Sequence, residues 1–157
     1  MTGLASETRE VTSQESAKRA TRVDWERWGI LYLRLALGVS FLSGIADRFG
    51  LYTGRNVGYG DFAGFVKYTA KVNSFMPAST IPFLAWAATA LELSFGLALV
   101  LGIWLRWAAL GSAVLLLVFA TAMAISFGIK SPLDYSVFSA SAGALVLTFH
   151  EFNKRGG

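Results

Sequence analysis

The stretch Ile81–Leu105, IPFLAWAATALELSFGLALVLGIWL, decides the fold of this chain. Its 25 residues are enough to cross a bilayer core with some tilt, and its only charged residue, Glu92, lies near the middle. A carboxyl group at that depth is costly when it faces lipid, so we expect Glu92 to face protein. Small residues share its helical face and would let a second backbone come close: Ala85, Ala88, Thr89 and Gly96. We therefore interpret the stretch as a transmembrane helix whose acid points into a bundle.

The composition of the whole chain indicates a protein embedded in the lipid bilayer. Of its 157 residues, 54% are hydrophobic and only 15% are charged, compared with roughly 25% charged in soluble domains. The net charge is +4, but no basic run accompanies it, so nucleic acid is not an expected partner. The chain has no cysteine and a single histidine, which argues against thiolate metal sites, Fe–S clusters and thiol chemistry. We expect no metal site.

Four apolar segments of about 17 to 25 residues predict four spanning helices. They cover residues 29–46, 81–105, 107–129 and 133–149, and glycine-rich or proline-containing stretches separate them. The predicted fold class is therefore all-α, an integral membrane bundle of four transmembrane helices over residues 28–150. Residues 1–27 are predicted to be a polar, mobile tail with a short helical turn near 16–22, and residues 151–157 a second short tail. More Lys and Arg residues fall on the side of the two termini, which favours cytoplasmic termini.

The long connection between the first two predicted spans contains a second helical pattern. Residues 61–76, DFAGFVKYTAKVNSFM, repeat apolar side chains at helical spacing, with Asp61 as a plausible N-cap. We expect a short amphipathic helix lying in the membrane interface. Two interpretations remain open for it: a cap packed on the bundle, or a lid over a lateral opening for a lipid-soluble ligand.

The first predicted span carries the second intramembrane charge, Arg34. It lies roughly 8 Å below the interface by helical rise, shallow enough for the guanidinium to snorkel to the surface. Alternatively, Arg34 reaches inward and pairs with Glu92, which fits a structural clasp and a proton site equally well. Asp47 ends a small polar stripe at the far end of this span, a pattern typical of helix packing but also a candidate ligand contact.

Two stretches resemble the DoxX family of small four-helix membrane proteins. The run Glu92–Gly102, followed by Trp104, Arg106 and Trp107, is similar to the family's second-span signature. The first span is also similar to that family, through Arg34, Gly38, Phe41 and Gly44. The resemblance covers about residues 28–150. One departure is that the family's lysine near the outer end of span one is missing, with Arg48 as its nearest substitute.

The resemblance implies a role in the membrane rather than one reaction. Some members of the family look like subunits of a thiosulfate:quinone oxidoreductase, and others are associated with membrane-bound redox and thiol stress complexes. We expect a protein of the bacterial plasma (inner) membrane. Our leading hypothesis is a membrane subunit of a quinone-linked redox assembly, in which Glu92 exchanges the quinol proton and Arg34 tunes its charge. The candidate ligand-binding residues are Trp86, Thr89, Phe95, Tyr135 and Asp47.

In this hypothesis, quinone is the candidate cofactor, and the partner is another redox subunit or a second copy of the chain. If the protein is an enzyme, it is an oxidoreductase subunit that uses no metal or thiol of its own. The alternative is a non-enzymatic membrane scaffold or chaperone-like subunit, in which Glu92 and Arg34 only lock the bundle. A small carrier is a third interpretation, weakened by the lack of broken helices.

Overall fold

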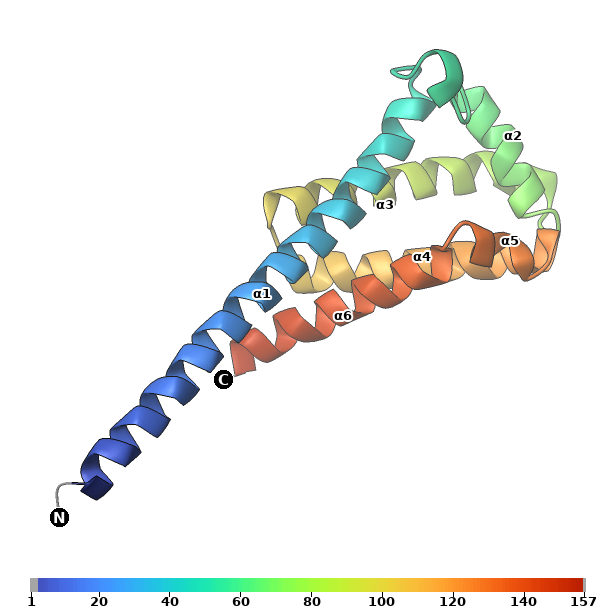
Figure 1. Ribbon diagram of the computed structural model, residues 1–157. Helices are drawn as coiled ribbons and strands as arrows, with labels where there is room; N and C mark the ends of the chain where they lie inside the picture. The colour runs from blue at the N-terminus through green and yellow to red at the C-terminus, as the bar shows by residue number, and fades with distance from the viewer. Residues whose placement is uncertain (1–2, 157) are drawn as a thin grey trace. The chain divides into compact units, whose positions relative to one another are not determined.

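The computed structural model describes the backbone of residues 3–156 and the side chains of residues 13–14, 25–55 and 57–154. It divides into two compact units at Tyr32 and Leu33. The described residues are helices joined by turns, with no strand among them, as predicted for an all-α fold (Figure 1). By length and composition, three helical segments of the described part of the chain are long and apolar enough to cross a membrane: Trp25–Arg48, Ala78–Leu101 and Leu105–Phe127.

Helix α1 runs over Gly3–Arg48 and so extends further at both ends than the sequence predicted. Its C-terminus lies two residues beyond the predicted end at residue 46, which brings Arg48 into the last turn. At the other end, residues 3–27 are helical instead of containing one short turn. The reason is local, because this stretch is rich in Glu, Ala, Arg and Lys and contains no proline. On which side of the membrane these residues lie stays a prediction.

Helix α3 (Ile81–Leu101) and helix α4 (Leu105–Phe127) form a tight helical hairpin. Both were predicted, but α3 ends four residues earlier and α4 begins two residues earlier. The reason is Gly102, whose φ of 78° gives the left-handed conformation that ends helices, and Trp104 follows with a φ of 46°. The turn therefore occupies Gly102–Trp104.

The last predicted span is divided in two. A short helix α5 (Lys130–Asp134) is followed by α6 (Val137–Gly156), with Ser136 between them at a φ of 55°. Helix α6 lies beside α4 (Figure 1), where the Ser141 hydroxyl donates a hydrogen bond of 2.8 Å to the Ala113 carbonyl oxygen. By length and composition α6 is not among the candidate spans, because its last turns are polar.

Helix α2 (Phe62–Val72) occupies the centre of the predicted amphipathic segment. Asp61 is its N-cap, as predicted, and accepts a 2.6 Å hydrogen bond from the Gly64 amide. The apolar face of α2 is buried through Phe65, Thr69 and Val72, and α2 contacts both α3 and α4. The helix ends at Val72 rather than at residue 76, and Asn73 ends it by donating to the Thr69 carbonyl oxygen.

The first half of the bundle depends on a close crossing of α1 and α3. A Cβ atom placed on Gly38 would lie 2.8 Å from a Val100 methyl group and 3.1 Å from the Gly96 carbonyl oxygen. A Cβ atom on Gly96 would likewise meet Leu42 and the Gly38 carbonyl oxygen at 3.1 and 3.2 Å. Because only glycine allows such an approach, these two residues fix the register in which α1 and α3 lie against each other.

Candidate functional site

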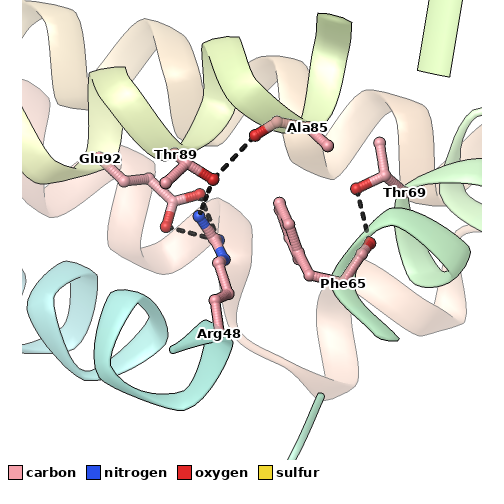
Figure 2. A network of polar contacts seen from close by, with 6 residues as sticks. All are labelled: Arg48, Phe65, Thr69, Ala85, Thr89 and Glu92. Atoms are coloured by element: carbon pink, nitrogen blue, oxygen red, sulfur yellow. Dashed lines mark hydrogen bonds and ion pairs between the residues drawn. The ribbon is translucent and has the colours of Figure 1, made fainter. Parts of the chain in front are cut away.

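Glu92 is buried as predicted, and its partner is Arg48. The Arg48 Nη2 atom donates to both carboxylate oxygens of Glu92, at 2.8 and 2.7 Å, and each residue is only 4% exposed (Figure 2). A charge-assisted contact of this length compensates much of the cost of burying the two charges. The last turn of α1 is thereby joined to the middle of α3.

The other terminal nitrogen of Arg48 has a partner on α3, the helix that carries Glu92. Its Nη1 atom donates to the Thr89 hydroxyl at 3.0 Å, and that hydroxyl donates to the Ala85 carbonyl oxygen at 2.8 Å (Figure 2). The Thr89 hydroxyl therefore has both roles satisfied within the protein. The Arg48 Nε atom is buried and has no hydrogen-bond partner.

An aromatic side chain covers the guanidinium from the side of α2. The Phe65 ring centroid lies 3.5 Å from the Arg48 Cζ atom, and the Tyr59 ring centroid lies 5.9 Å away. Phe65 is 5% exposed and packs in a cluster with Ala85 and Ala88 of α3. A cation over a ring face is stabilised further in dry surroundings. We name the group Arg48, Glu92, Thr89 and Phe65 the clasp, because it joins α1, α3 and α2.

Asp47 holds the loop that precedes α2. Its carboxylate accepts hydrogen bonds from the backbone amides of Gly58, at 3.0 Å, and Tyr59, at 2.6 Å. These bonds place the Tyr59 ring beside Arg48 and Tyr68. Burial raises the pKa of the Tyr59 hydroxyl to about 12, so this side chain is neutral at physiological pH. Asp47 therefore anchors a loop, using both of its carboxylate oxygens.

Arg34 does not pair with Glu92, and this part of the sequence hypothesis is wrong. Its guanidinium lies against the turn after α3, where a Cβ atom on Gly102 would be 3.2 Å from Arg34 Nη1. Gly102 is ten residues from Glu92, or about 15 Å along a helix. The glycine crossing of α1 and α3 explains the outcome, because their antiparallel register places Arg48 beside Glu92 and Arg34 beside Gly102.

The remaining predicted ligand contacts do not gather around Glu92. The Phe95 ring fills the space beside Gly111 of α4, where a Cβ atom would come within 2.4 Å of it. Trp86 is half-exposed and packs against Phe62, with ring centroids 4.3 Å apart. Tyr135 follows α5 and is 73% exposed. Of the predicted ligand contacts, only Thr89 is part of the clasp, while Asp47 holds the loop that carries Tyr59.

Sequence reasoning missed the aromatic residues Phe65 and Tyr59 and named Arg48 only as a substitute for the family's lysine. A usable signal was present, because consecutive spanning helices are antiparallel and the glycine pair fixes their register. Counting outward from Gly38 opposite Gly96 places Arg48 level with Trp86. That position is about 9 Å along α3 from Glu92, a gap that an arginine side chain can cross, whereas Arg34 is level with Val100, about 12 Å away. Among the described residues, no group of three His, Cys, Asp or Glu side chains lies close enough to hold a metal ion.

The geometry of the clasp supports a mechanical role more directly than a catalytic one. Both oxygens of Glu92 and both terminal nitrogens of Arg48 are occupied by protein groups. Such an arrangement fixes three helices relative to one another. Proton exchange at Glu92 would require the ion pair to open first.

Comparison with known proteins agrees with the resemblance seen in the sequence. The family model DoxX matches residues 29–126, which include α2, α3, most of α4 and the part of α1 that carries Arg34 and Arg48. No curated protein and no solved structure matches the chain significantly. The match covers more than half of the chain, together with the apolar helices and both residues of the buried ion pair. The chain is an integral membrane protein that belongs to the DoxX family.

Proposed function

We propose that this protein is a structural subunit of a membrane assembly, with the clasp holding its helices in a fixed arrangement. The single observation that carries the proposal is the Arg48–Glu92 contact, 2.7 Å long and 4% exposed at both residues, in which both carboxylate oxygens and both terminal guanidinium nitrogens have protein partners. A site that exchanges a ligand or a proton needs a polar atom without a protein partner, or a path from the site to water or to the ligand. A pair enclosed by Thr89 and Phe65 is suited to fixing helix positions.

The proposed topology has four spans, α1, α3, α4 and α6, with both termini in the cytoplasm of a bacterial inner membrane. Helix α2 lies in the opposite interface and covers the clasp. Support comes from the apolar lengths of three helices, from the packing of α6 along α4, and from the distribution of Lys and Arg residues. The exposed Lys67 and Lys71 of α2 fit the polar face of an interfacial helix.

A double-mutant cycle tests the structural role of the clasp. Removing one partner of a buried ion pair leaves an uncompensated charge and costs about 3–5 kcal/mol, whereas replacing both with apolar groups is often neutral. We expect Arg48→Met and Glu92→Gln each to destabilise the protein in detergent, and the double variant to be more stable than either single variant. Additive losses would contradict a structural clasp.

A quinone-linked redox subunit is the second candidate. Its specific support is the buried carboxyl group in the middle of an apolar helix, together with the unpartnered Nε atom of Arg48. In this candidate Glu92 exchanges the quinol proton, and Arg48 takes the place that the sequence hypothesis gave to Arg34. The partner would be a redox subunit carrying its own cofactor.

The two candidates predict different behaviour of the double variant Arg48→Met/Glu92→Gln. A structural subunit needs only the fold, so the double variant should keep the protein partners that co-purify with wild type in gentle detergent. A redox subunit needs the carboxyl group, so the same variant should lose quinone reduction in membranes even when it folds normally. Quinone extraction from the purified wild type provides the second measurement, because a structural subunit retains no stoichiometric quinone.

A further inference from the structure

Arg34 is an intramembrane cation that forms no ion pair among the described residues. It lies within the spanning segment Trp25–Arg48, nine residues from its start. Among the described residues, its guanidinium makes no hydrogen bond or ion pair, and its Nε atom is buried without a partner. Arginines inside spanning helices usually pair with an acid, a carbonyl group or a water-filled space. Neither an acid nor a carbonyl group pairs with Arg34 among the described residues, so its charge is available to a bound anion.

The backbone near Arg34 also lacks negative partners for its amide groups. The guanidinium lies against Gly102, and α4 begins three residues later with Trp104 as an N-cap that makes no side-chain cap hydrogen bond. The amides of Leu105 and Arg106 precede the first hydrogen bonds of α4, which are donated by Trp107 and Ala108 to the Trp104 carbonyl oxygen. Uncapped amides at the start of a 23-residue helix attract negative charge.

A second arginine lies at the same turn. Arg106 follows Gly102 by four residues, so chain connectivity keeps their Cα atoms within about 14 Å. Its guanidinium stacks over the rings of Trp107 and Phe152, at 5.4 and 5.7 Å, and makes no ion pair among the described residues. Ring stacking leaves the N–H groups at its edge free to donate. Two half-buried arginines and one uncapped helix end thus adjoin the α3–α4 turn, Arg34 through its contact with Gly102 and Arg106 through its position in the first turn of α4.

The surface around this turn is apolar. Large hydrophobic side chains are exposed on both sides of it: Leu101, Ile103, Trp104 and Trp107, each at least 50% exposed. Tryptophan is enriched where protein meets the headgroup region of a bilayer. An anion bound here would lie beside acyl chains, which distinguishes a lipid from a soluble phosphate.

We propose that the α3–α4 turn binds the phosphate of an anionic phospholipid headgroup, with Arg34 and Arg106 as its two cationic contacts. Arg34 contacts the phosphate from α1, Arg106 contacts it from α4, and the acyl chains lie along the exposed apolar residues of the turn. Basic pockets between spanning helices bind acidic headgroups in this manner. The site is separate from the clasp, so the proposal does not depend on the function proposed above.

Native mass spectrometry of the full-length protein tests this site. Binding of one phosphatidylglycerol is compared with binding of phosphatidylcholine that has the same acyl chains. The wild type is expected to prefer phosphatidylglycerol. Arg34→Gln should weaken that preference about fivefold, and Arg34→Gln/Arg106→Gln about 25-fold, because each arginine near a membrane surface contributes on the order of a fivefold gain. Arg34→Lys should stay within about twofold of wild type, since it keeps the charge.

The control is Arg55→Gln, which removes an exposed arginine from the loop after α1 and should leave the preference unchanged. A wild-type protein without any preference for phosphatidylglycerol would overturn the proposal without reliance on a variant. Unchanged binding in Arg34→Gln/Arg106→Gln would also overturn it. An excess of inorganic phosphate separates the two sources of the anion. Failure to displace the lipid supports a lipid site, and complete displacement contradicts it.

Discussion

Helix α1 carries two arginines within its membrane-spanning segment, and the protein treats them in opposite ways. Arg48 is enclosed by a carboxylate, a hydroxyl group and an aromatic ring, and is 4% exposed. Arg34 lies fourteen residues earlier, against a glycine backbone, with no hydrogen bond or ion pair among the described residues. The difference arises from register, because the side chain of one arginine reaches Glu92 of α3 and the other lies against the turn that ends α3.

An intramembrane charge alone therefore does not identify a functional residue. On the same helix, Arg48 joins three helices through its contacts, whereas Arg34 forms no ion pair among the described residues. The clasp should therefore respond to mutation through stability, and the α3–α4 turn through binding of anions.

The largest expected effect comes from Arg48→Met compared with Arg34→Met. The first variant leaves Glu92 buried without a partner and should lower the free energy of unfolding by about 3–5 kcal/mol. The second removes a cation that has no ion-pair partner among the described residues and should change stability by less than about 1 kcal/mol. Unfolding of both variants in mixed micelles provides the measurement. Equal losses would contradict the contrast between the two arginines.

Gly38→Ala tests the crossing that places both arginines. Its new methyl group would lie 2.8 Å from Val100 and 3.1 Å from the Gly96 carbonyl oxygen, so α1 and α3 must separate. We expect a loss of about 1–3 kcal/mol in the free energy of unfolding. Gly29→Ala is the control on the same helix, since nothing lies within 4 Å of the added methyl group. Equal free energies of unfolding for Gly38→Ala and Gly29→Ala would contradict a close crossing of α1 and α3 at Gly38.

Gly102→Ala should affect the Arg34 end through two routes. Its φ of 78° strains a residue with a side chain by about 1–2 kcal/mol, and the methyl group would displace the Arg34 guanidinium. Gly128→Ala is the control, with a φ of 85° and no atom within 4 Å. Its ψ of 158° lies in a region that essentially only glycine adopts, so this variant should lose at least as much stability as Gly102→Ala, but only Gly102→Ala should also weaken binding of phosphatidylglycerol. If both variants weakened lipid binding, the loss in Gly102→Ala would not be due to displacement of Arg34.

The smallest expected effect is that of Phe65→Leu in the clasp. Leucine retains an apolar side chain but loses the ring face that lies 3.5 Å from the Arg48 Cζ atom. A buried cation over a ring contributes about 1–2 kcal/mol, so a loss of that size is expected in the unfolding experiment. Phe83→Leu, at an exposed position of α3, serves as the control. The contribution of the ring would be disproved by an identical change in both variants.

Much of the fold follows from the sequence, because apolar length and helical spacing are local properties. These predicted α3, α4 and the amphipathic α2, together with the Asp61 N-cap. The ends of α3 and α4 were less predictable, since they depend on the left-handed turn at Gly102 and Trp104. The break at Ser136 was missed for the same reason, because serine rarely adopts a positive φ.

The site was predicted only in part. Burial of Glu92 follows from the cost of a charge in lipid, a rule that needs no knowledge of neighbours. The identity of its partner is a tertiary property, set by how far α1 slides along α3. Arg34 was chosen because it lies deeper in the predicted span, while Arg48 fell outside a span that was predicted to end at residue 46. Phe65 could not be predicted as a clasp residue, since the helical spacing of residues 61–76 predicted only that it lies on an apolar face.

The register of α1 against α3 places both arginines, and disulfide trapping measures it directly. The chain has no native cysteine, so an introduced pair gives an unambiguous signal. Leu42→Cys with Gly96→Cys should cross-link in membranes, because a Cβ atom on residue 96 lies 3.1 Å from the Leu42 side chain. Leu42→Cys with Ala85→Cys, on the same face of α3 but eleven residues away, should not. Cross-linking of the 42/85 pair instead of the 42/96 pair would place Arg34 beside Glu92 and contradict this account.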